Sequence, residues 1–406
     1  MKPEASAVVF CMEGQGHIKR LVPIVSGLAR AGVPSHVFTQ PCFKGEIENA
    51  GGAFVDLYRG RPLDEADATS TPISCRNVTF AAHFAKSVVT EAAALKPSLV
   101  VSDAFAVIGE VVANHLRVPR VNVCAGHNFP PAVALGVLSH DARVKVSDAC
   151  WRAVKRLRAE HGIPDASPLS YATGMSRDLN VYGEPPQYLA EDQRQPFQPV
   201  VFMGSLSEQT ISRAPSGASH YGEGAADRER IYVSFGTIVW RYYSDIARRA
   251  LEAVREAVAD RPESIALVSL GGGQRDDWAR RVELPNFRVE SYVDQWDVLG
   301  ASSVYITHHG LNSTHEAAFQ QVPMISYPFL HDQPGMAKRS QELGLAVPLG
   351  TELCGPVRAV DVHAALSRVA ALGETMRARL AEARQWELDV IAGRSGVIQR
   401  ILDLIR

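Results

Sequence analysis

The segment 307–316 contains polar residues of types that could hold an anion. It reads Thr-His-His-Gly-Leu-Asn-Ser-Thr-His-Glu and lies between an apolar strand pattern and a helical pattern. The amides of Asn312 and Ser313 would then begin a helix, where free N–H groups and the helix dipole favour negative charge. Gly310 would let a ligand approach the backbone, and His308 could add a hydrogen bond. A diphosphate fits this description, although a capped helix with incidental histidines fits the spacing equally well.

Three further residue sets offer groups suited to a nucleotide. Glu316 follows the start of the expected helix by about one turn and could reach ribose hydroxyls. The strand over 231–234 is followed by Phe-Gly-Thr, where a turn at Gly236 and Thr237 could contact phosphate oxygens. Tyr292 comes just after another strand and could stack on a nucleobase. Taken alone, the turn is a common strand ending and Tyr292 is a packing residue.

The segment 327–333 supplies polar groups that suit a sugar. Asp332 and Gln333 offer acceptor and donor atoms for hydroxyl groups. If the segment stood alone, it would be interpreted as an ordinary solvated loop.

A histidine near the N-terminus is placed for proton transfer. His17 follows the first expected strand, and Gly14 and Gly16 keep the intervening loop slim. Asp103 follows the strand over 99–102, which could lie beside the first strand. A carboxylate next to an imidazole orients it and stabilises its protonated form, as a general base requires. A lone histidine is more often structural, so this pair depends on the two strand ends meeting.

The two glycines before His17 could be mistaken for a dinucleotide-binding fingerprint. Lys19 stands where that fingerprint needs its third glycine, and no acidic residue follows about 20 positions on. A nicotinamide-dependent enzyme is therefore disfavoured.

Brief β-rich runs alternate with helical patterns in both halves of the chain, which favours parallel sheets covered by helices on both faces. The expected strands span 8–11, 36–39, 54–57, 99–102 and 120–123, and then 231–234, 265–270, 287–290, 303–307 and 324–327. The expected helices span 18–30, 105–116, 245–259, 312–320, 337–343, 360–369 and 375–389. Ligands bind beyond the carboxyl ends of such strands.

Length and composition narrow the class of protein further. With 406 residues, two domains are expected: 1–205, then a linker over 206–229, a second domain over 230–385, and final helices over 386–406 that could cross back to the first. The net charge of −2 gives no basic excess, so nucleic acid is a poor partner. No apolar run reaches the ~18 residues of a membrane span, and we expect a cytoplasmic protein. The six scattered cysteines suggest neither a disulfide framework nor a metal site.

Taken together and in this order, the motifs resemble the GT-B-fold glycosyltransferases of family 1, which include plant secondary-metabolite and bacterial macrolide and antibiotic glycosyltransferases. The resemblance covers nearly the whole chain and is densest over 231–347. It implies an α/β fold of two doubly wound, Rossmann-like domains that face each other across a cleft. The first would bind the acceptor and the second a nucleotide sugar, either UDP- or TDP-linked, as co-substrate with no other cofactor.

The resemblance also implies roles for individual residues. The family's donor signature matches the segment from His308 to Glu316. By that match, the diphosphate would be held by His308, Gly310, Asn312 and Ser313, and the ribose by Glu316. The family's Trp-x-Pro-Gln segment matches Tyr292-Val-Asp-Gln, which adds Val293 and Gln295 to the donor site, with Tyr292 in place of the usual tryptophan. The family's sugar-gripping acidic-Gln pair matches Asp332 and Gln333. Its N-terminal Gly-His and its dyad aspartate match Gly16-His17 and Asp103.

These roles predict an inverting, metal-independent transfer of a sugar to a small hydroxyl-bearing acceptor. Phe80, Phe84 and Phe129 suggest an apolar pocket for a lipophilic or aromatic natural product, although such residues are more often core. A nucleotide-sugar epimerase or hydrolase of the same fold is an alternative, as is a non-catalytic homologue that activates another transferase. The protein would be a monomer or a homodimer.

Overall fold

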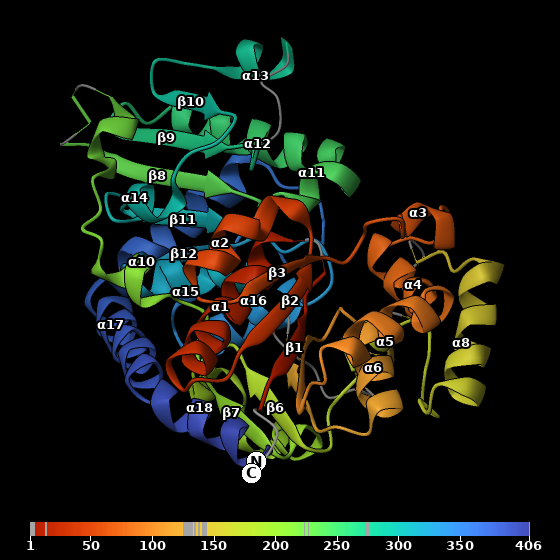
Figure 1. Ribbon diagram of the computed structural model, residues 1–406. Helices are drawn as coiled ribbons and strands as arrows, with labels where there is room; N and C mark the ends of the chain where they lie inside the picture. The colour runs from red at the N-terminus through yellow and green to blue at the C-terminus, as the bar shows by residue number, and fades with distance from the viewer. Residues whose placement is uncertain are drawn as a thin grey trace. The chain divides into compact units, whose positions relative to one another are not determined.

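The computed structural model describes residues 5–12, 14–124, 133, 135, 136, 139, 144–222, 224–225, 227–272 and 277–405. The chain divides into two compact units, each an α/β structure (Figure 1). Unit 1 comprises Met1–Ser205 together with Val390–Arg406, and unit 2 comprises Leu206–Asp389.

Unit 1 is built on a seven-stranded sheet in which every neighbouring pair is parallel. In spatial order the strands are β3 (Ala53–Asp56), β2 (Ser35–Thr39), β1 (Ala7–Phe10), β4 (Leu99–Asp103), β5 (Arg120–Val123), β6 (Leu179–Tyr182) and β7 (Val200–Phe202). β1 and β4 are buried along their whole length because helices cover both faces. The strand order reverses between β1 and β4, which makes their carboxyl ends the topological switch point where α/β sheets bind ligands.

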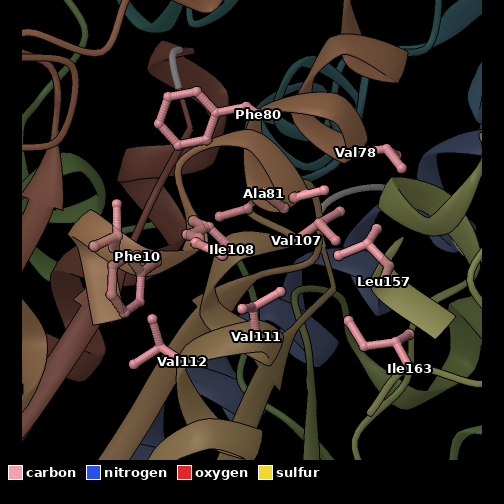
Figure 2. Packing of buried hydrophobic residues seen from close by; sticks show 14 of the residues in the cluster. Phe10, Val78, Phe80, Ala81, Val107, Ile108, Val111, Val112, Leu157 and Ile163 are labelled. Atoms are coloured by element: carbon pink, nitrogen blue, oxygen red, sulfur yellow. The ribbon is translucent and has the colours of Figure 1, made fainter. Parts of the chain in front are cut away.

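The helices of unit 1 pack their apolar faces on this sheet and on one another. They are α1 (Gln15–Arg30), α2 (Lys44–Asn49), α3 (Leu63–Ala66), α4 (Arg76–His83), α5 (Ala85–Ala94), α6 (Ile108–Leu116), α8 (Asp148–Glu160), α9 (Ser170–Thr173) and α18 (Arg394–Asp403). Figure 2 shows part of one core cluster, where buried side chains from β1, α4, α6 and α8 converge. On the other face of the sheet, α18 packs on α1 although they lie at opposite ends of the sequence (Figure 1).

Unit 2 repeats the design with a six-stranded parallel sheet. Its strands, in spatial order, are β10 (Phe287–Glu290), β9 (Ser264–Ser269), β8 (Glu229–Ser234), β11 (Val304–Thr307), β12 (Met324–Ser326) and β13 (Ala346–Pro348). Its helices are α10 (Glu208–Ser212), α11 (Ile238–Tyr242), α12 (Ser244–Ala259), α13 (Asp277–Val282), α14 (Gln295–Leu299), α15 (Leu311–Phe319), α16 (Gln333–Glu342) and α17 (Ala359–Ala392). The strand order reverses between β8 and β11, so unit 2 has its own switch point.

Two parallel sheets in two α/β units confirm the predicted fold class, and all ten predicted strands are present to within two residues at each end. The helix predicted over 105–116 begins only at Ile108, because a tight turn follows β4, with the Ala106 amide donating to the Asp103 carbonyl at 2.8 Å. The helices predicted over 360–369 and 375–389 are the two arms of α17, which kinks at Gly373. In the described part of the chain, no helix has the length and apolar character needed to cross a bilayer.

Candidate active site

The switch point of unit 1 brings His17 and Asp103 together. Strands β1 and β4 pair in parallel, with Phe10 opposite Ser102, so that their carboxyl ends lie side by side. His17 lies in the first turn of α1 and Asp103 is the last residue of β4. Their Nδ1 and Oδ2 atoms are 2.9 Å apart. Because the carboxylate can only accept, Nδ1 donates, and the Nε2 atom of the neutral ring carries the lone pair.

Neighbouring residues hold the His17 ring in this orientation. Its imidazole packs against Phe105, with ring centroids 4.7 Å apart. A side chain at Gly14 would bring a Cβ atom to 2.8 Å from Cδ2 of His17, so this position needs glycine for space. Asp103 is 2% exposed and His17 is 19% exposed, so the carboxylate is shielded while the imidazole reaches the surface of unit 1.

Unit 1 has a small pocket at the turn that follows β4, where the Ala106 amide binds the Asp103 carbonyl. Its lining comprises Met12, Leu57, Tyr58, Asn77, Phe80, Ala106, Val107 and Ile108. Two of the phenylalanines predicted to line the acceptor pocket take different positions. Phe80 is 2% exposed and belongs to the core as well as to the pocket lining, whereas Phe84 is half-buried and packs on Phe80 at 5.0 Å between ring centroids. The third candidate, Phe129, lies outside the described residues.

In unit 2, the switch point between β8 and β11 brings two of the predicted segments together around His308. A Cβ atom at Gly236 would lie 2.6 Å from Nε2 of His308, and one at Gly310 would lie 2.5 Å from the same atom. The imidazole therefore covers both glycines and fits only because neither has a side chain. Gly236 also has φ of +71°, which favours glycine on backbone grounds. Thr237 is exposed beside this turn, at the start of α11.

The two neighbouring histidines have different surroundings. Burial lowers the pKa of His308 to about 4, although the Ser234 carbonyl opposes this shift, so the ring is neutral near pH 7. Its Nδ1 atom is buried without a well-formed hydrogen bond to any described residue. His309 is fully buried, and its ring is held by hydrogen bonds to Thr314 at 3.1 Å and Ser326 at 2.8 Å. His309 is therefore structural, because both of its ring nitrogens already have partners.

Helix α15 begins directly after this histidine pair. Its N-cap residue is Gly310 and makes no side-chain capping bond, so Asn312 and Ser313 lie in an uncapped first turn. The first amides of a helix have no intrahelical partner and carry the positive end of its dipole. A helix start with a neutral histidine and two glycines beside it suits a diphosphate.

A hydrogen-bond network joins α14 to α15. Gln295 Nε2 donates to Glu316 Oε2 at 2.7 Å and to Ser313 Oγ at 3.1 Å, and Tyr305 Oη donates to Gln295 Oε1 at 3.1 Å. The structure thus brings together three predicted donor residues from two segments 18 to 21 positions apart. Tyr305 was not predicted; the signal is its place on β11, two residues before Thr307, where strand alternation puts both on one face.

The remaining predicted donor residues lie at the ends of two nearby elements. Tyr292 is 72% exposed just before α14, while Val293 is buried. Asp332 is the N-cap residue of α16, and Gln333 begins that helix. Gln333 Oε1 accepts hydrogen bonds from the Phe329 and Leu330 amides at 2.9 and 3.2 Å, so the carbonyl end of this side chain closes its own loop. Among the described residues, no three histidine, cysteine, aspartate or glutamate side chains are grouped to hold a metal ion.

Comparisons with known proteins agree with this geometry. Residues 186–371 match the family described as UDP-glucoronosyl and UDP-glucosyl transferase, a stretch that contains all of the predicted donor residues. The chain is 23% identical over 353 residues to the uncharacterized UDP-glucosyltransferase YdhE of Bacillus subtilis, which covers 83% of this chain and 84% of that protein.

Solved structures share the fold over the full length. The glycosyltransferase of kitacinnamycin has a TM-score of 0.76 at 19% identity, with complete coverage of both chains. A UDP-glucose: anthocyanidin 3-O-glucosyltransferase in complex with UDP has a TM-score of 0.72 at 17% identity, covering 99% of this chain and 100% of that one. The full-length likeness to solved glycosyltransferases shows that this chain has their fold, and the segment 186–371 matches the family of UDP-glucoronosyl and UDP-glucosyl transferases.

Proposed function

We propose that this glycosyltransferase moves a sugar from a UDP- or TDP-linked donor to a hydroxyl of a small lipophilic or aromatic natural product, with inversion and without a metal ion. The single observation that carries the proposal is the 2.9 Å contact between His17 and Asp103 at a switch point. A buried carboxylate and a partly exposed imidazole are the arrangement needed to deprotonate a hydroxyl.

In the proposed reaction, His17 Nε2 takes the proton of the acceptor hydroxyl. The acceptor oxygen attacks the anomeric carbon of the sugar as the bond from that carbon to the diphosphate oxygen breaks on the opposite side, which inverts the configuration. Asp103 accepts from Nδ1 throughout and stabilises the imidazolium that forms. Asp103 is therefore a positioning residue, and His17 is the base.

The leaving diphosphate needs hydrogen-bond donors that are already in place. The amides at the start of α15 supply them, and Thr237 adds a hydroxyl at the neighbouring turn. His308 lies beside these donors as a neutral ring, because burial lowers its pKa to about 4, and it therefore adds no full positive charge. Preorganised donors of this kind are commonly worth about 3 kcal/mol each in a transition state.

The nucleoside and the sugar have candidate partners on the same side of the unit 2 sheet. Glu316 and Gln295 hold each other at 2.7 Å and present polar atoms for the ribose, while the exposed Tyr292 offers a ring face for the base. Asp332 and the amide nitrogen of Gln333 are the groups assigned to sugar hydroxyls. The family description and the UDP complex of the anthocyanidin transferase support a uridine donor.

The test compares His17→Ala and Asp103→Asn with wild type, using UDP-glucose and a panel of aromatic alcohols. We expect transfer to fall by about 10²- to 10⁴-fold for His17→Ala, because a general base contributes that much, while UDP affinity is unchanged. His363→Ala, on α17, is the matched control and should keep full activity. Retained turnover in both variants would remove the base assignment, and donor consumed without acceptor would indicate an epimerase or a hydrolase.

A further inference from the structure

Arg213 belongs to none of the segments assigned to chemistry, yet it lies against the helix beside the proposed nucleoside site. It falls within the stretch 206–229 that composition predicts to be a linker. In the structure this stretch contains α10 and the short 3-10 helix η6 (Gly217–Tyr221). The residues between them, 213–216, run along α14.

The Arg213 guanidinium is bound to the acidic groups that begin α14. Its Nη2 atom donates to both carboxylate oxygens of Asp294, at 2.8 Å each, and lies 3.4 Å from Oδ1 of Asp297. Asp294 is also the N-cap residue of α14, because its side chain accepts from the Asp297 amide at 3.3 Å. Partial burial raises the pKa of Asp294, but the hydrogen bonds from Arg213 and Asp297 outweigh this and hold the pKa below its usual range.

Further contacts hold the segment 213–217 against α14. Trp296 Nε1 donates to the Arg213 carbonyl at 3.1 Å, and Ser216 Oγ donates to Asp297 at 3.2 Å. A Cβ atom at Gly217 would lie 1.9 Å from the Asp297 carbonyl oxygen, so the two backbones touch directly. The segment 213–217 is therefore held on α14 by two side-chain hydrogen bonds, an ion pair and a direct backbone contact.

The first residue of α14 carries the contacts to the donor helix. Gln295 follows Asp294 directly and binds Glu316 and Ser313 of α15 through its amide group. Tyr292 precedes Asp294 by two residues and is largely exposed. Asp294 thus lies between the two residues assigned to the nucleoside, and Arg213 is the side chain that holds it.

We propose that Arg213 is a positioning residue that fixes Tyr292 and Gln295 for the nucleoside of the donor. The inference rests on the proposed function, since it assumes that a nucleoside diphosphate binds there. Loss of Arg213 should therefore weaken binding of the nucleoside. It should not weaken binding of the diphosphate, because the diphosphate site at the start of α15 is formed without Arg213.

The separate effects on nucleoside and diphosphate binding can be measured because replacing Arg213 should not unfold the protein. The Arg213 and Asp294 side chains are 48% and 42% exposed, and ion pairs so close to water contribute little to folding stability. The Arg213→Ala variant is therefore expected to fold. Arg379→Ala is a matched control, because Arg379 forms a similar exposed pair with Glu382 elsewhere in unit 2.

The experiment titrates the full chain with UDP and, separately, with inorganic pyrophosphate by calorimetry. We expect Arg213→Ala to weaken UDP binding by about fivefold and to leave pyrophosphate binding unchanged. Asp294→Asn keeps a good N-cap but removes the charge, so it should reproduce the loss, and Arg213→Lys should restore part of the affinity. Arg379→Ala should bind both ligands as wild type does.

Three results would overturn the inference, and each has a different meaning. Equal UDP affinity in Arg213→Ala and wild type would show that Arg213 positions nothing. Equal losses of UDP and pyrophosphate would assign Arg213 to general support of unit 2. If UDP failed to bind the wild-type chain while pyrophosphate bound, the nucleoside part of the proposed function would be rejected as well.

Discussion

His315 on α15 and Glu387 on α17 form a fully buried pair, with Nδ1 of the histidine 2.5 Å from Oε1 of the carboxylate. The other carboxylate oxygen, Oε2, is buried without a hydrogen bond to any described residue. Glu387 is therefore a fully buried carboxylate that accepts a hydrogen bond from His315. Because α15 also begins the proposed diphosphate site, the pair ties that helix to α17.

Removing one member of this pair should be far more harmful than removing both. We expect His315→Leu to lower the free energy of unfolding of unit 2 by about 3–5 kcal/mol, since it leaves Glu387 buried and uncompensated. The double variant His315→Leu, Glu387→Leu should recover most of that loss, because apolar residues can fill the site. Urea unfolding followed by tryptophan fluorescence checks both. A double variant as unstable as the single one would contradict this account.

Gly310, at the start of α15, should be needed because a side chain there would occupy the space of the His308 ring. Gly310 has φ of −62°, so its backbone accepts alanine, but the new Cβ would lie 2.5 Å from Nε2 of the imidazole. We expect Gly310→Ala to displace the ring and weaken UDP binding by about tenfold. Calorimetric titration with UDP measures the effect.

A variant that lacks the imidazole supplies the control for that prediction. In a His308→Ala background, adding Gly310→Ala should change UDP affinity very little, because the displaced ring is already gone. Gly350→Ala, where a Cβ would meet no atom within 4 Å, should bind UDP like wild type. Additive losses in the double variant would show that Gly310 acts on its own.

The buried His308 should make stability depend on pH in a defined direction. Burial lowers its pKa to about 4, and the unfolded chain titrates near the ordinary value of about 6.5. Between those values the unfolded state binds the extra proton, so stability is complete above about pH 6.5 and declines as the pH falls toward 4. From pH 7 to pH 5 this one residue should reduce the free energy of unfolding by about 2 kcal/mol.

Comparison with His308→Gln isolates that contribution, since glutamine does not titrate. Urea midpoints at pH 7 and pH 5 should differ more for wild type than for the variant. Identical pH dependence in the two proteins would mean that the ring is not held neutral by burial.

Strands could be predicted from the sequence where burial on both faces of the sheet requires a continuous run of apolar residues. β1 and β8 have such runs and were placed to within two residues. β6 and β7 were missed because β6 carries Asn180 inside a four-residue strand, where it pairs with Asn122, and β7 has only three residues. β13 is equally short and ends at Pro348, which looks like a loop from sequence alone.

Residue types at strand ends indicated the candidate site. Which of those residues contact one another follows only from the three-dimensional structure. The sequence motifs contain His308, Gly236 and Gly310 separately, and nothing in their spacing shows that one imidazole ring covers both glycines. It also could not find Arg213, because a segment rich in small and polar residues has linker composition whether or not it packs. Such contacts arise between elements, and periodicity within one element carries no information about them.

The position of α18 has a consequence for how the chain folds as it is synthesised. Ile398 packs so closely on α1 that a Cβ at Gly27 would lie 2.4 Å from it, and the two helices share one apolar cluster with the sheet. During synthesis, the apolar face of α1 therefore stays uncovered by α18 until about 370 further residues, up to Ile398, have been made. Unit 1 can therefore complete its packing only after unit 2 has been synthesised.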